Sequence, residues 1–195
     1  MVSNRIKLKS IELEKEEKEV KVIVANYRTG STTFSQSIGG SGFEYLHKKI
    51  RDFTGPNEEQ VFKIMPDNWQ YEKHWEDFKR LYLDVADKIY ICARRDFNAQ
   101  ISSHIYATYT KDWHPNNTGK PGLPNISNSI LEEYKTMSYD LDLRNLEWQS
   151  KIYKEYDAEL VWLEDRYDVK NKYTRKFNME IPSYNFDVNP EVYFA

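Results

Sequence analysis

Apolar residues gather along the chain in a few short, unbroken runs. Four runs, at 22–25, 61–65, 88–93 and 160–163, are rich in β-branched and aromatic residues. Such runs are typical of strands that are buried on both faces of a parallel sheet. Residues 5–13 instead alternate between apolar and polar side chains, which predicts an edge strand or one arm of a hairpin.

Helical spacing of apolar residues fills much of the sequence between these runs. It predicts helices over 34–38, 74–86, 97–109 and 127–156. Within 74–86 we expect the apolar and aromatic stripe to belong to the core and not to bind a ligand. This stripe consists of Trp75, Phe78, Leu81, Tyr82 and Val85.

Because strands alternate with helices, the pattern predicts an α/β fold, namely a three-layer sandwich with a mainly parallel sheet. A chain of 195 residues suits a single domain, 1–195, with a core over about residues 20–165. The pattern of the tail, 166–195, predicts no definite structure. In such sheets ligands bind at the carboxyl ends of the strands.

Composition narrows the choice of partners. Hydrophobic residues make up 39% and aromatic residues 15%, which indicates a globular protein. The net charge of −3 argues against a general nucleic-acid binder, so any anion site must concentrate basic residues locally. The one cysteine, Cys92, lies in an apolar run and is expected to be a small buried hydrophobe. Without a signal peptide pattern or a long apolar span, we expect a cytoplasmic protein with no membrane span.

A compact polar turn follows the apolar run at 22–25. It contains Arg28, Thr29, Gly30, Ser31, Thr32 and Thr33, and it precedes the predicted helix at 34–38. The order of strand, glycine-containing turn and helix aims backbone N–H groups at an anion. Gly30 permits close approach or a positive φ, and the hydroxyl groups offer donors and helix N-caps.

A second turn of this kind follows the run at 88–93. Arg94 leaves the strand, and Ser102 lies about two helical turns further on, on the same side of the predicted helix. A guanidinium and a hydroxyl together suit a terminal phosphate. An Arg–Asp pair with a surface serine is the structural alternative.

The two motifs together resemble those of sulfotransferases that use 3′-phosphoadenosine 5′-phosphosulfate (PAPS). The first motif is Arg28-Thr29-Gly30-Ser31-Thr32, and the second is Arg94-Arg95-Asp96 with Gln100 and Ser102 downstream. The bacterial branch that sulfates trehalose and related glycolipids is the most similar. In that branch a late strand ends in a Glu-Asp pair, and here the apolar run at 160–163 is followed by Glu164-Asp165.

The resemblance covers about residues 22–165 and implies a P-loop nucleotide-kinase-like fold. It implies that residues 28–33 hold the 5′-phosphosulfate and that Arg94 and Ser102 hold the 3′-phosphate. The acceptor would be the hydroxyl group of a small molecule or glycan, such as a carbohydrate or glycolipid. The family needs no metal, and the histidines lack ligand spacing with cysteines or acids. They are His47, His74, His104 and His114.

Two residues are candidates for the catalytic base. The resemblance places Glu44 where the trehalose-type enzymes carry their base, whereas His47 has an ordinary pKa suited to proton transfer near neutrality. A glutamate needs a raised pKa to act as a base near neutral pH, and a shielded pocket can supply it. We therefore favour Glu44 over His47. Arg28 would stabilise charge on the leaving phosphate. Trp113 and His114, in the predicted loop at 111–125, either line the acceptor pocket or anchor the loop.

The sequence also departs from the family. Phenol-type members carry Lys-Thr-His where this chain has Lys63-Ile64-Met65, and their late cofactor clamp is missing. A non-catalytic nucleotide-binding or interaction protein of the same fold is therefore an alternative. A small P-loop kinase is another, although the G-K-[ST] lysine of that motif is absent.

Overall fold

The structure is a computed structural model that describes residues 19–42, 61–65, 72–110, 128–167 and 185–195. Helices are interspersed among the strands along these segments, as the hydrophobic pattern predicts. No helix in the described segments has the length and apolar character needed to cross a membrane.

Four strands form one sheet in the described part of the chain, and every neighbouring pair runs parallel. The order across the sheet is β2-β1-β3-β4, so β1 and β3 are the inner strands. The prediction of an α/β fold with a mainly parallel sheet is confirmed. The strands are β1 (Lys21–Ala25), β2 (Val61–Ile64), β3 (Lys88–Ala93) and β4 (Glu159–Trp162).

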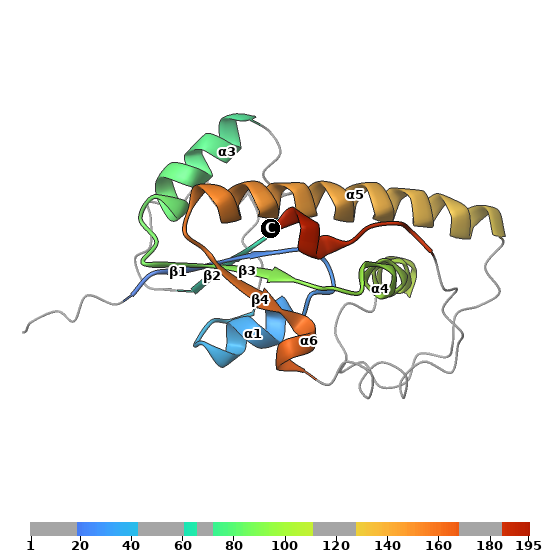
Figure 1. Ribbon diagram of the computed structural model, residues 1–195, viewed down its shortest axis with the longest axis horizontal. Helices are drawn as coiled ribbons and strands as arrows, with labels where there is room; N and C mark the ends of the chain where they lie inside the picture. The colour runs from blue at the N-terminus through green and yellow to red at the C-terminus, as the bar shows by residue number, and fades with distance from the viewer. Residues whose placement is uncertain (1–18, 43–60, 66–71, 111–127, 168–184) are drawn as a thin grey trace, which may run out of the picture.

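Helices cover both faces of this sheet (Figure 1). The long helix α5 lies along one face, where α3 also packs, whereas α1 and α6 lie on the opposite face. Helix α4 follows β3 directly and packs against α5. The helices are α1 (Ser31–Ser37), α3 (Glu72–Phe78), α4 (Phe97–Thr110), α5 (Asn128–Glu155) and α6 (Leu163–Arg166).

Strand β1 has an unbroken apolar run because its side chains are buried on both faces of the sheet. Successive side chains of a strand point to opposite faces of the sheet. Val22 and Val24 therefore join the core beneath α5, while Ile23 and Ala25 join a smaller core beneath α1. Burial on both faces explains why residues 22–25 are all apolar, and the inner position of β1 in the sheet places its carboxyl end between β2 and β3.

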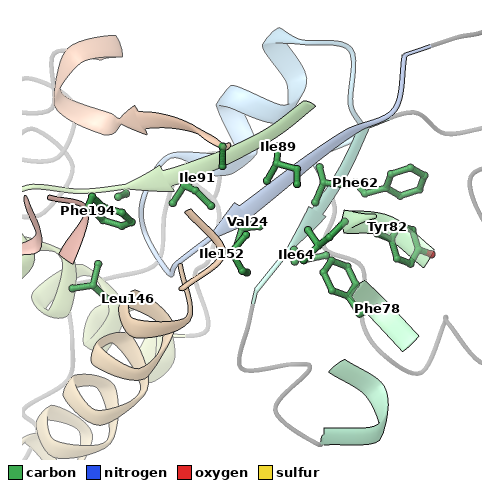
Figure 2. Packing of buried hydrophobic residues seen from close by; sticks show 14 of the residues in the cluster. Val24, Phe62, Ile64, Phe78, Tyr82, Ile89, Ile91, Leu146, Ile152 and Phe194 are labelled. Carbon is green, nitrogen blue, oxygen red and sulfur yellow. The ribbon is translucent and has the colours of Figure 1, made fainter. Parts of the chain in front are cut away.

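The larger core is formed by side chains of the sheet, of α5 and of the α3 region (Figure 2). Phe62 and Ile64 of β2 lie next to Phe78 and Tyr82, whose rings stack with their centroids 5.2 Å apart. Leu146 of α5 lies at the other end of this core.

The aromatic stripe predicted within 74–86 is confirmed for Trp75, Phe78 and Tyr82, all of which are buried. It is wrong for Val85, which is 48% exposed. The helix changes to a π-helical turn over Lys79–Leu83, which adds a residue per turn and shifts the helical phase. Val85 lies beyond that turn and outside the stripe.

The C-terminal residues 185–195 return to α5 and β4. The side chain of Ser150 in α5 donates a hydrogen bond to the carbonyl of Tyr193, and the ring of Phe194 packs against Trp162. A short 3₁₀ helix, η3 (Pro190–Tyr193), lies within this segment. The predicted strand at 5–13 lies outside the described residues.

Candidate functional site

The strand order reverses at β1. The chain leaves β1 for β2 on one side and then returns to β3 on the other side of β1. In open parallel sheets, the crevice at the carboxyl end of such a reversal is the usual ligand site. The turns that follow β1 and β3, which carry the two predicted motifs, lie at this point.

The turn after β1 is tightly wound. Arg28 has a φ of 59° and Gly30 a φ of 72°, both in the left-handed region. The hydroxyl of Thr29 donates to the carbonyl oxygen of Asn26 over 2.8 Å and closes the turn. A left-handed conformation costs a residue with a side chain about 1–2 kcal/mol, so contacts around Arg28 must maintain it.

Helix α1 begins at Ser31, three residues before the predicted start, and Gly30 is its N-cap. The hydroxyls at 31–33 were expected to lie in the turn, but they lie in the first turn of the helix, and none of them caps it. The helix starts early because the left-handed Gly30 reverses the chain at once. With seven residues, α1 is a short helix.

Gly30→Ala is expected to lower the free energy of unfolding by about 2 kcal/mol. Alanine disfavours the positive φ, and its methyl group would contact Leu163 Cδ1 of α6. Gly39→Ala is the matched control, because Gly39 also has a positive φ but nothing lies within 4 Å of the added carbon. Urea denaturation of both variants measures the difference. Equal losses would mean that the contact with α6 is unimportant.

Arg28 extends from the turn after β1 to α4. Its Nε atom donates to the Oγ atom of Ser103 over 2.8 Å. The preceding residue, Tyr27, stacks on His104 of the same helix with ring centroids 4.3 Å apart. The turn after β1 is therefore attached to the helix that follows β3, which brings the two predicted motifs into one site.

Lys63 of β2 is a site residue that the sequence did not identify. Its side chain is buried, and its Nζ atom donates to the Oγ1 atom of Thr32 over 2.9 Å. The turn itself carries no lysine, so the ammonium group beside it comes from the neighbouring strand. The pairing of Lys63 with Ile23 sets it on the face that carries α1.

Cys92 lies near this lysine but is not a reactive thiol. Burial raises its pKa to about 12, although the positive charges of Lys63 and Arg166 act in the opposite direction. A thiol with this pKa stays protonated near neutral pH. The prediction that Cys92 is a buried hydrophobe is confirmed.

Arg94 and Ser102 are both buried and both make contacts within the protein. The Nε atom of Arg94 lies 3.7 Å from Oε1 of Glu164, and the hydroxyl of Ser102 donates to the carbonyl oxygen of Asn98. Glu164 also accepts hydrogen bonds from the backbone N–H groups of Arg95 and Asp96. A phosphate at Arg94 would therefore compete with the carboxylate of Glu164.

Arg95 joins three parts of the chain. Its guanidinium forms two hydrogen bonds with Asp165, of 2.6 and 2.9 Å, and one with Glu191 of η3. It also lies over the ring of Trp162, with 4.8 Å between Cζ and the centroid. The hydrogen bonds from the Arg95 guanidinium hold the pKa of the Asp165 carboxyl below its usual value. The Glu164-Asp165 pair thus holds the turn after β3 in place.

A stripe of buried polar side chains on α5 lies beneath the carboxyl ends of the two inner strands. The amide of Gln149 donates to the carbonyl oxygens of Val24 and Cys92, which belong to the two inner strands. The sequence signal for this stripe is a set of polar residues spaced by four, three and four along one helix face. They are Ser138, Asp142, Asn145 and Gln149, each at most 1% exposed.

The two candidate bases, Glu44 and His47, lie outside the described residues, as do Trp113 and His114. Within the described segments, no group of three or more histidine, cysteine, aspartate or glutamate residues is placed to hold a metal ion. Comparisons of the chain with protein-family models, curated proteins and solved structures found no match.

Proposed function

We propose that the protein is a PAPS-dependent sulfotransferase that acts on a hydroxyl group of a carbohydrate or glycolipid. One observation carries the proposal: two turns with the family's basic motifs meet where the strand order reverses. Arg28 from the first turn contacts Ser103, next to Ser102 in the helix that bears the second motif. The order β2-β1-β3-β4, with the glycine turn after an inner strand, also supports a P-loop nucleotide-kinase-like fold.

The chemistry of the side chains suits the proposed donor nucleotide at its sulfuryl end. Arg28, the hydroxyls of residues 31–33 and the buried ammonium of Lys63 surround one turn, and all of them can donate hydrogen bonds to an anion. At the other end, Arg94 would hold the 3′-phosphate in place of its contact with Glu164, and Ser102 would add its hydroxyl.

PAPS would supply an activated sulfuryl group for an acceptor oxygen to attack in line. The protein would then contribute positioning and charge stabilisation, by analogy with phosphoryl transfer. Arg28 and Lys63 would stabilise negative charge on the departing phosphate oxygen, while Glu44 or His47 would take the acceptor's proton. Glu44 is the preferred base in this proposal.

A non-catalytic nucleotide-binding protein of the same fold is the second candidate. The observation that favours it is that Arg94 and Ser102 already contact Glu164 and Asn98 within the protein. In this alternative the Arg94-Arg95-Asp96 segment stabilises the turn after β3 and holds no phosphate.

Transfer of radiolabelled sulfate from PAPS to a panel of sugars and glycolipids tests the function. We expect transfer to at least one acceptor, and no phosphate transfer from ATP in a parallel reaction. Binding of adenosine 3′,5′-bisphosphate without any transfer, unchanged by Glu44→Gln and by His47→Ala, would favour the non-catalytic alternative. The absence of both binding and transfer would contradict the proposal, and phosphate transfer from ATP would favour a kinase.

A further inference from the structure

A buried pair of polar side chains, His104 and Asp142, joins α4 and α5 directly behind the turn that carries Arg28. The Nδ1 atom of His104 lies 3.1 Å from Oδ2 of Asp142, and the two side chains are 4% and 0% exposed. A carboxylate only accepts hydrogen bonds, so Nδ1 carries the hydrogen in this contact. The pair therefore fixes both the position and the orientation of the imidazole ring.

Two neighbouring residues of α4 contact two neighbouring residues of the turn. The ring of His104 stacks on Tyr27, at an interplanar angle of 20°, while Ser103 accepts the hydrogen bond from Arg28. Together these contacts oppose rotation of the backbone between Tyr27 and Arg28. They give a physical reason why Arg28 keeps its left-handed conformation.

Helix α5 contacts Asn26, the residue at which the same turn begins. The side-chain amide of Asn26 donates to the backbone carbonyl of Asp142 over 2.8 Å and accepts from Asn145 over 3.3 Å. The same Asn26 oxygen accepts from the backbone N–H of Tyr27. The backbone carbonyl of Asp142 thus contacts Asn26 at the start of the turn. Its carboxylate contacts His104, which stacks on the turn.

We propose that His104 and Asp142 are positioning residues that hold Arg28 in the orientation needed to bind an anion. Asn26, His104, Asp142 and Asn145 are buried and joined by hydrogen bonds, and the ring stack connects them to Tyr27. A connected polar network of this kind gives a polar core one defined geometry. The link to an anion rests on the proposed function, whereas the hold on the turn is a property of the free protein.

Hydrogen exchange of the backbone amides in residues 26–31, followed by mass spectrometry, tests the hold on the turn. We expect His104→Ala and Tyr27→Leu to speed this exchange about tenfold, because each removes the ring stack that opposes opening. Tyr27→Leu alters a half-buried residue of the turn, so it remains informative if His104→Ala does not fold. Ser138→Ala is the control, because Ser138 is buried on the same face of α5, one turn before Asp142.

Calorimetric titration of the same proteins with adenosine 3′,5′-bisphosphate tests the link to the anion. We expect the dissociation constant to rise about tenfold in the two variants and to stay unchanged in Ser138→Ala. Unchanged exchange in the variants, or an equal increase in the control, would overturn the positioning role. Faster exchange with unaltered affinity would overturn its link to the anion. If the wild-type protein binds no bisphosphate, the proposed function fails, and the exchange experiment still decides the positioning role.

Discussion

Lys63→Met is expected to raise the dissociation constant for adenosine 3′,5′-bisphosphate at least about a hundredfold, without destabilising the free protein. Lys63 is 2% exposed, and its ammonium lies at the first turn of α1. Burying a charge costs several kcal/mol, so a neutral side chain of similar length removes a cost from the fold. The same replacement removes a cation from the proposed anion site.

Thermal unfolding with and without the nucleotide measures both effects. At one hundred times its dissociation constant, a ligand stabilises a protein by about 2.7 kcal/mol, and at the same ligand concentration this increment should fall to about 0.4 kcal/mol or less in the variant. Lys88→Met is the control, since Lys88 lies at the opposite end of the sheet and pairs with Glu19. A variant that loses stability but keeps full affinity would show that Lys63 serves only the fold.

Arg94→Ala is expected to weaken PAPS binding about a hundredfold, and to weaken binding of adenosine 5′-phosphosulfate far less. The second nucleotide lacks the 3′-phosphate that Arg94 is proposed to hold, so the comparison isolates that contact. Competition titrations with the two nucleotides provide the measurement. Equal losses for both would place the role of Arg94 elsewhere.

Glu164→Gln is the matched variant for Arg94. Removing the carboxylate charge 3.7 Å from the guanidinium frees Arg94 for a phosphate, so nucleotides with a 3′-phosphate should bind more tightly. Glutamine has one acceptor oxygen in place of two for the amides of Arg95 and Asp96, so stability should fall by about 1 kcal/mol. Lower stability with unchanged nucleotide affinity would favour the non-catalytic alternative.

Much of the fold follows from the sequence because burial on two faces leaves a clear signature. The four apolar runs became the four parallel strands, and the stretches 97–109 and 127–156 correspond to α4 and α5. The errors lie at the ends of elements. Helix α1 starts early at a left-handed glycine, and a π-helical turn moves Val85 out of the stripe. Local backbone conformations of this kind depend on packing that a hydrophobic pattern does not record.

The site was predicted only in part, because its geometry depends on which strands are neighbours. Arg28 and Arg94 were identified from their motifs, and the sheet order places both turns at the reversal. Lys63 appeared in the sequence only as one residue of a run that lacks the family's histidine. Its contact with Thr32 follows from the pairing of β2 with β1, which the sequence does not specify. The roles of Glu44 and His47 stay predictions.

The hydrogen bonds of the polar stripe on α5 were also beyond prediction. Asp142 and Asn145 follow a helical spacing in the sequence, but polar residues at such spacing usually face solvent. Their contacts with Asn26 require α5 to cross the carboxyl end of β1. Only the assembled layers show that this stripe faces inward.

A crystal structure with adenosine 3′,5′-bisphosphate bound tests the central claim most directly. We predict that the 5′-phosphate will lie against Arg28 and Lys63, and that the 3′-phosphate will lie against Arg94, drawn away from Glu164. The account would be contradicted if crystals soaked in the nucleotide show none bound at either turn. Binding at another place on the protein would contradict it as well.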